Sequence, residues 1–253
     1  FQPERIRRPE NVATLEALLP DVIVVVGYGQ IIPQSIIDIP RHGMLNVHPS
    51  LLPKYRGAAP IQWAVANGDT ETGVTIMRID AGLDTGDMLL KWTTPILQYE
   101  TAPELSGRLA TAGASLLIEA LQEIDAGTAE YTPQNGSQTS YAPILKKEDG
   151  RIDWSQEAWS IYNRLRGFTP WPGAYCTFRF RTLHVLQAAP LDTAVSGAPG
   201  ALHPDKRRLF VTCGGNTSLE LLEVQVDGKK RMGIADFLNG HSLQPGESLG
   251  GTP

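Results

Sequence analysis

The chain has 253 residues and a formal net charge of −5, with 42% hydrophobic and 19% charged residues. This composition excludes disordered and fibrous proteins, and no apolar run approaches the roughly 18 residues that a membrane span needs. The two cysteines, Cys176 and Cys213, are too few for a disulfide framework, so a reducing compartment is expected. The length indicates one large or two ordinary domains. Because the chain starts at Phe1 in a basic, proline-bounded segment, we expect the native protein to be longer at its N-terminus.

The first half of the chain alternates predicted helices with predicted strands. Asn11 is a good N-cap for an apolar helix that Pro20 ends. The β-branched run at residues 21–26 predicts a strand buried on both faces of a parallel sheet. Further strands are predicted at residues 43–48, 74–79 and 88–94, and further helices at residues 60–67 and 103–125. This order predicts an α/β domain with an open, Rossmann-like, mostly parallel sheet that binds ligands at the carboxyl ends of its strands.

The pattern changes after residue 127, where Thr, Ser, Gly, Pro and Asn become frequent and predict an ordered linker. Beyond it, Ser155 is the predicted N-cap of a helix at residues 156–167. Short strands predicted at residues 174–180, 183–188, 208–213 and 218–226 favour a small β-barrel or sandwich. We therefore expect one domain at residues 1–130, a linker at 131–148 and a second domain at 149–253.

Charge is divided unevenly between these parts. Residues 1–148 have a net charge of −6, whereas residues 149–253 have a net charge of +1 and contain basic clusters such as Lys206–Arg208 and Lys229–Arg231. The overall negative charge argues against a general DNA-binding protein, but local basic patches can attract a polyanion. The alternative for each cluster is a solvated turn.

The pair Asn46 and His48 stands at the end of a predicted strand. Side chains two residues apart lie on one face of a strand, and Pro49 ends the strand there. An amide N–H can stabilise the oxyanion of a tetrahedral intermediate, and an imidazole can move a proton near neutral pH. The alternative is a turn-forming pair. The loop at residues 80–87 follows another strand and contributes Asp84, a carboxylate that could orient His48 and bind a water molecule. This loop fails the calcium pattern at Gly82, so no metal is expected.

The segments NVHPSLLPKYRGAAPIQWAVANGD (46–69) and GVTIMRIDAGLDTGDML (73–89) resemble the core of the folate-dependent formyltransferases. The resemblance implies that Asn46, His48 and Asp84 are the catalytic trio and that 10-formyltetrahydrofolate is the formyl donor. It also implies a folate site bordered by Ser50, Leu51, Leu52, Pro53, Gln30, Ile32 and Asp80. In this family the sheet begins with a βαβ portion that has no counterpart before Phe1.

Residues 142–175 and 229–240 resemble the second domain and closing segment of the bacterial members that formylate initiator methionyl-tRNA. The resemblance implies an OB-like β-barrel that helps to bind tRNA, in a cytoplasmic protein that we expect to be a monomer with no DNA or membrane partner. Lys and Arg side chains that release counter-ions would supply salt-sensitive affinity. The expected tRNA-binding residues are Arg56, Lys146, Lys147, Lys206, Arg207 and Arg208.

The implied reaction is attack of the neutral α-amine of methionine on the formyl carbon. Asn46 and protonated His48 would stabilise the oxyanion, and Asp84 would organise proton removal through water. Two alternatives stay open: the acceptor is a small amine such as a sugar nucleotide, or the chain binds RNA or folate without catalysis.

Overall fold

The computed structural model describes residues 1–193 and 195–250, and the chain divides into two compact units. The first unit comprises residues 1–63, 70–98 and 104–144, and the second comprises residues 64–69, 99–103 and those from 145 onward. Within the described part of the chain, each helix is too short or too polar to cross a lipid bilayer.

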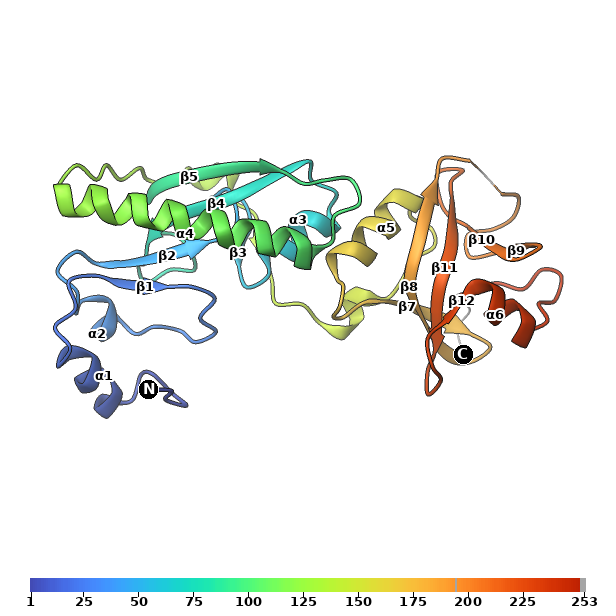
Figure 1. Cartoon of the computed structure of the whole chain (residues 1–253), viewed down its shortest axis with the longest axis horizontal. Coiled ribbons are helices and arrows are strands. Elements are labelled where there is room, and N and C mark those ends of the chain that lie inside the picture. The colour runs from blue at the N-terminus through green and yellow to red at the C-terminus, as the bar shows by residue number, and fades with distance from the viewer. Residues whose placement is uncertain (194, 251–253) are drawn as a thin grey trace. The chain divides into compact units, whose positions relative to one another are not determined.

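A four-stranded sheet forms the centre of the first unit (Figure 1). Its order is β1-β2-β4-β5, from strands β1 (Ile23–Val25), β2 (Met44–His48), β4 (Glu71–Arg78) and β5 (Met88–Pro95). The α/β class is confirmed. Strand β1 pairs in parallel with β2, whereas β4 pairs antiparallel with both β2 and β5. The sheet of this chain is therefore mixed rather than mostly parallel. One reason is the loop at residues 79–87, which is too short for a parallel crossover.

Helix α4 (Ala102–Ala126) runs along one face of this sheet (Figure 1). Gly113 permits the close approach, because a Cβ atom there would lie 3.0 Å from a methyl group of Val47 on β2. Helices α1 (Pro9–Glu16) and α2 (Gln34–Ile37) share a separate apolar cluster with β1. Ile36 and Met44 are buried in this cluster. Helix α3 (Pro60–Ala66) lies between β2 and β4 in the sequence.

Two local predictions in the first unit are wrong. Helix α1 begins at Pro9 with Arg8 as its N-cap, because proline at the first position fits the helix, so Asn11 lies inside it. Strand β1 is only half-buried, and Val26 beyond it is 66% exposed. The reason is that β1 is an edge strand of the described sheet and pairs with β2 alone.

Residues 131–142, here called the strap, fall in the segment expected to be a linker. They belong to the first unit and pair with it. Thr132 exchanges two backbone hydrogen bonds with Met88, and β6 (Tyr141–Ala142) pairs in parallel with β3 (Arg56–Gly57). The short 3-10 helix η1 (Gly136–Gln138) lies between these contacts, and a second, η2 (Lys147–Gly150), follows the strap. The strap is therefore part of the packed structure of the first unit.

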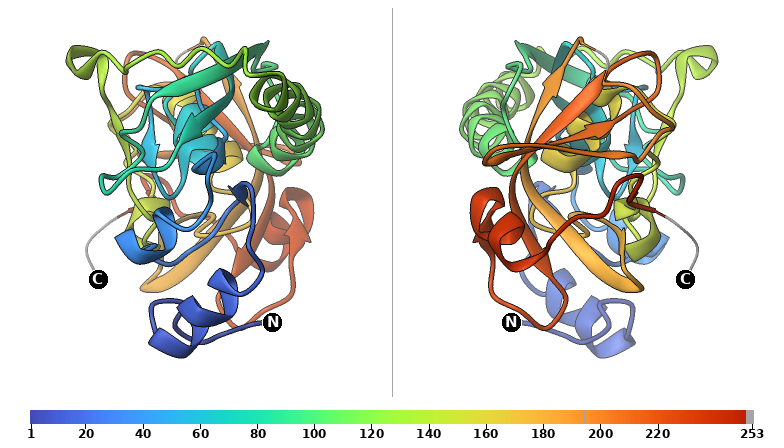
Figure 2. Two further views of the ribbon diagram at one scale, coloured as in Figure 1. Left: turned by 90° about the vertical axis from the view of Figure 1, so that its left-hand side faces the viewer. Right: turned by 90° about the vertical axis from the view of Figure 1, so that its right-hand side faces the viewer.

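An antiparallel sheet with the order β7-β8-β11-β10-β9 forms the second unit, and β12 also pairs with β11. The long strands β8 and β11 are curved, and helix α6 (Ile234–Gly240) lies beside β11 (Figure 2). The strands enclose a core that includes Trp154, Phe178 and Phe237. This arrangement fits the expected OB-like domain. The strand bounds are β7 (Ala174–Phe178), β8 (Arg181–Leu191), β9 (Leu202–Asp205), β10 (Arg208–Thr212), β11 (Ser218–Val226) and β12 (Met232–Gly233).

Helix α5 (Ala158–Gly167) packs on β8 and β11. The prediction of Ser155 as its N-cap is wrong, because the backbone N–H and the hydroxyl of Ser155 both donate to Asp153 and the helix starts three residues later. Cys176 and Cys213 are free and buried, and burial raises the pKa of each thiol to about 12. Both cysteines therefore have the character of core residues.

Candidate active site

Strand β2 places Asn46 and His48 on one face, as the spacing predicts. Its last residue, His48, is 3% exposed, whereas Asn46 is half-buried. The strand is held on both sides, since Asn46 is in register with Val25 of β1 and with Met77 of β4. An amide and an imidazole are thus fixed side by side at one end of a central strand.

The loop between β4 and β5 brings Asp84 to this pair. Its Oδ1 accepts a hydrogen bond of 3.3 Å from Nδ2 of Asn46, and its Oδ2 lies 3.8 Å from Nδ1 of His48. The backbone N–H of Gly57 donates to the same Oδ2 at 2.8 Å. Asp84 has a φ of +51°, a left-handed conformation that aspartate tolerates better than most residues. The three residues predicted as a trio therefore meet.

The hydrogen bonds of His48 define which ring nitrogen faces the carboxylate. Nε2 lies 2.9 Å from the carbonyl oxygen of Tyr55, and because a carbonyl can only accept, Nε2 carries a proton. Nδ1 faces Asp84 and is the atom that gains or loses the second proton. Burial lowers the pKa of His48 below the usual 6.5, and the negative charge of Asp84 and the bond to Tyr55 partly oppose that effect. The imidazole is thus predominantly neutral at pH 7 in the free protein.

The segment Ser50–Pro53, expected to border the folate site, is held by hydrogen bonds to Lys54 and to Thr75 of β4. The hydroxyl of Ser50 donates to the carbonyl of Lys54, while Thr75 Oγ1 donates to the carbonyl of Ser50 and accepts from the N–H of Leu52. Leu52 and Pro53 are buried and Leu51 is half-buried, so a ligand could reach Leu51 more readily than its neighbours. Lys91 Nζ donates to the carbonyl of Leu52, and burial lowers the pKa of this lysine.

The other expected folate residues lie on two loops. The side-chain oxygen of Gln30 accepts a hydrogen bond from the N–H of Ile6, and Ile32 packs in the apolar cluster under β1. Asp80 is exposed, and its Oδ1 accepts from the N–H of Gly82 and from the hydroxyl of Thr85. Asp80 therefore shapes the same loop that carries Asp84.

A further residue, Gln134 of the strap, bonds to the β4–β5 loop and to Arg56 beside the trio, and no motif in the sequence indicates it. Its Nε2 donates to the carbonyl oxygens of Asp84 and Gly86, both at 2.8 Å. Its Oε1 accepts from Nε and Nη2 of Arg56, at 3.0 and 2.7 Å. Arg56, expected to bind tRNA, is only 8% exposed, and this engagement of its guanidinium argues against a direct phosphate contact.

The remaining basic residues of the expected tRNA surface are exposed. Lys206 and Arg207 form the two-residue turn between β9 and β10, since Asp205 and Arg208 are paired across it. Arg208 differs from them because its guanidinium forms a two-point ion pair with Glu220, at 2.7 Å for each bond. Lys146 and Lys147 precede and begin η2.

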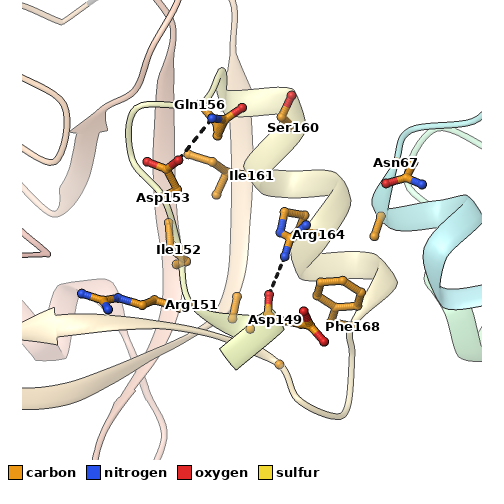
Figure 3. Close-up of a pocket in the computed structure, with 14 residues that line it drawn as sticks. Asn67, Asp149, Arg151, Ile152, Asp153, Gln156, Ser160, Ile161, Arg164 and Phe168 are labelled. Atoms are coloured by element: carbon orange, nitrogen blue, oxygen red, sulfur yellow. Dashed lines mark hydrogen bonds between the residues drawn. The ribbon is translucent and has the colours of Figure 1, made fainter. Parts of the chain in front are cut away.

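A cavity of about 440 Å³ lies in the second unit, beside α5 (Figure 3). Arg164 points into this region and donates to the backbone carbonyl of Asp149, and Gln156 donates to Asp153. The lining carries both signs of charge, and none of the trio contributes to it. We therefore assign the reactive site by its functional groups rather than by cavity size.

Comparisons with known proteins identify the family of the chain. Residues 1–121 match the family described as formyl transferase, and residues 144–242 match the formyl transferase C-terminal domain. The chain is 55% identical to the methionyl-tRNA formyltransferase of Solibacter usitatus, over 99% of this chain and 80% of that protein. The protein of the same name from Koribacter versatilis is 53% identical, over 98% of this chain and 80% of that protein. The chain belongs to the methionyl-tRNA formyltransferase family.

Solved structures with the same fold are more distant. WlaRD, a sugar 3N-formyl transferase crystallised with dTDP and 5-N-formyl-THF, has a TM-score of 0.66 and 20% identity, over 85% of this chain and 77% of that chain. HypX from Aquifex aeolicus has a TM-score of 0.67 and 20% identity, over 92% of this chain and 41% of that chain. At this level of identity the two structures support the fold, and the resemblance to the formyltransferase family is confirmed by the closer relatives.

Proposed function

We propose that the protein transfers the formyl group of 10-formyltetrahydrofolate to the α-amino group of methionine on initiator tRNA, and that Asn46, His48 and Asp84 carry the reaction. The observation behind this proposal is the convergence of the three side chains from strand β2 and from the β4–β5 loop. Relatives that are about half identical over nearly the whole chain share the name of this activity. The product would supply translation initiation in the bacterial cytoplasm.

Asn46 supplies a hydrogen-bond donor for the oxyanion. Its amide has two N–H bonds, and the contact with Asp84 uses one of them. The second can donate to the formyl oxygen as negative charge develops there. Because the amide is fixed in a central strand, little reorganisation is needed at the moment of reaction.

His48 gains its charge when the oxyanion forms. Burial disfavours the imidazolium in the free site, whereas a nearby oxyanion would favour it. Nδ1 would take up the proton that the attacking amine loses as the tetrahedral intermediate forms, and would return it through water to N10 when the intermediate collapses. The bond from Nε2 to Tyr55 keeps the ring in place during this step.

Asp84 binds the water that carries the proton. The attacking amine forms a bond to the formyl carbon and loses one proton, while the bond from this carbon to N10 of the folate breaks and N10 gains one proton. The carboxylate, close to both Asn46 and Nδ1 of His48, is placed to hold water between the two nitrogens of the substrates. The scheme uses no metal ion.

For the acceptor, we propose that the exposed cations of the second unit bind tRNA phosphates, foremost Lys206 and Arg207 at the β9–β10 turn and Lys146 and Lys147 at η2. Arg208 contributes less because Glu220 neutralises it. For the donor, we propose that the loops at residues 30–32, 50–53 and 80–83 hold the folate. We further propose that the protein acts as a monomer.

The test is transfer of labelled formyl from 10-formyltetrahydrofolate to charged initiator methionyl-tRNA. The proposal expects formylated methionyl-tRNA with the wild-type chain and a large loss with Asn46→Ala or Asp84→Ala. Near-wild-type turnover by either variant would overturn the assignment of the trio. Transfer to an amino sugar nucleotide in place of tRNA would identify a small-amine acceptor, and binding of RNA or folate without any turnover would identify a binding protein.

A further inference from the structure

The amide of Gln134 links the backbone of the β4–β5 loop to the side chain of Arg56 on β3. Both of its N–H bonds are used, one by the carbonyl of Asp84 and one by the carbonyl of Gly86. Its oxygen accepts from two nitrogens of Arg56. A planar amide of this length is the group that can donate on one side and accept on the other.

The conformation of Asp84 explains why such a connection is useful. A left-handed backbone is unfavourable for an L-residue, so contacts from neighbouring groups must hold it. The carboxylate must also reach Asn46 and the N–H of Gly57 together. Gln134 bonds to the backbone of Asp84 and to the guanidinium of Arg56, the residue that precedes Gly57. One side chain is therefore bonded to Asp84 and to the neighbour of Gly57, on the two sides of the Gly57–Asp84 hydrogen bond.

We propose that Gln134 is a positioning residue, which sets the carboxylate of Asp84 against Asn46 and His48 by fixing Asp84 and Gly57 together. The inference rests on the proposed function, because it gives Asp84 a role in formyl transfer. Gln134 acts through Asp84.

Gln134→Glu is the sharpest variant. It keeps the length of the side chain and an acceptor for Arg56, but it removes both N–H donors and places an oxygen against the carbonyls of Asp84 and Gly86. Gln138→Glu is the matched control, because it makes the same change at an exposed position of the strap. Both variants add one negative charge.

The first readout is the amide proton of Gly57, followed by NMR in the isotope-labelled full chain. With Gln134→Glu, its resonance should shift toward the position seen in Asp84→Ala, and its hydrogen exchange should be about tenfold faster. Gln138→Glu should leave both unchanged. An unchanged Gly57 amide in Gln134→Glu would overturn the inference. This measurement needs no substrate, so its result does not depend on the proposed function.

The second readout separates kcat from KM in the formyl-transfer assay. Misplacement of a reacting group by about 1 Å can cost about 100-fold in rate, so kcat should fall about 10- to 100-fold in Gln134→Glu. The KM for tRNA should stay within about twofold of wild type. A rise in KM at constant kcat would overturn the inference. If the wild-type chain transfers no formyl group while the Gly57 amide responds as expected, the proposed function fails and the positioning of Asp84 stands.

Discussion

The trio and the basic turn of the second unit differ in how their polar groups are held. Around Asn46, His48 and Asp84, the side chains are buried or half-buried and bond to fixed backbone groups. Lys206 and Arg207, in contrast, are exposed at the end of a hairpin. Groups that make or break bonds need a fixed geometry, whereas long exposed cations can follow a phosphate backbone. Substitutions should therefore change kcat in the first region and KM in the second.

The largest expected effect comes from Asp84. Asp84→Ala removes the acceptor of both Asn46 and Gly57, and we expect kcat to fall about 1,000-fold or more. Asp84→Asn keeps an oxygen and the tolerance of a left-handed backbone, so it isolates the effect of the charge. It should also lose more than about 100-fold in the formyl-transfer assay. Asp84→Asn with normal turnover would show that the negative charge is dispensable.

Asn46→Ala should lower kcat by about 100- to 1,000-fold, the usual cost of losing one oxyanion donor. Single-turnover kinetics at saturating tRNA would measure the loss. Because the amide of Asn46 carries no charge, the fold-change should be the same at 50 and 200 mM salt. A loss that appears only in KM would place Asn46 in substrate binding instead.

Reversal of the basic turn should act on binding. Lys206→Glu combined with Arg207→Glu should raise the KM for tRNA about tenfold, and the salt dependence of binding should weaken by about two units of slope. The control is Arg5→Glu with Arg7→Glu, which makes the same charge change at exposed residues of the first unit. Equal effects of the two double variants would mean that overall charge, rather than this surface, controls tRNA binding.

The smallest effect is on stability. The folded-state pKa of His48 lies below its ordinary value, so the unfolded chain binds a proton first as the pH falls. The stability that His48 contributes should be complete above about pH 6.5 and decline below it, by at most about 1.4 kcal/mol per pH unit. Urea unfolding of wild type and His48→Gln between pH 5 and 8 would measure this difference. Asp84→Asn removes the attraction that raises the pKa of His48, so the decline in the free energy of unfolding should continue to lower pH. A difference independent of pH would contradict the buried neutral imidazole.

The sequence was most informative where a local pattern determines geometry. The two-residue spacing of Asn46 and His48 required only that β2 be a strand, and the loop after β4 led to Asp84. Gln134 could not be found in this way, because its partners are 48, 50 and 78 residues away and its neighbours resemble a linker. The bonds between Arg56 and Gln134 could not be found for a related reason, because nothing near Arg56 in the sequence indicates an acceptor 78 residues away.

The strap also determines where this chain can be recombined with a relative. A crossover near residue 130, where the composition changes, would take Gln134 from one parent and Asp84 from the other. It would also separate Ser140 from the N–H of Tyr55, to which its hydroxyl is bonded. A crossover after Ala142 keeps these pairs together, and it falls next to residue 144, where the match to the C-terminal domain begins. The part of the chain that bonds to the loops around the trio therefore extends to residue 142, beyond the helices and the four-stranded sheet of the first unit. An exchange of domains between relatives should use this later boundary.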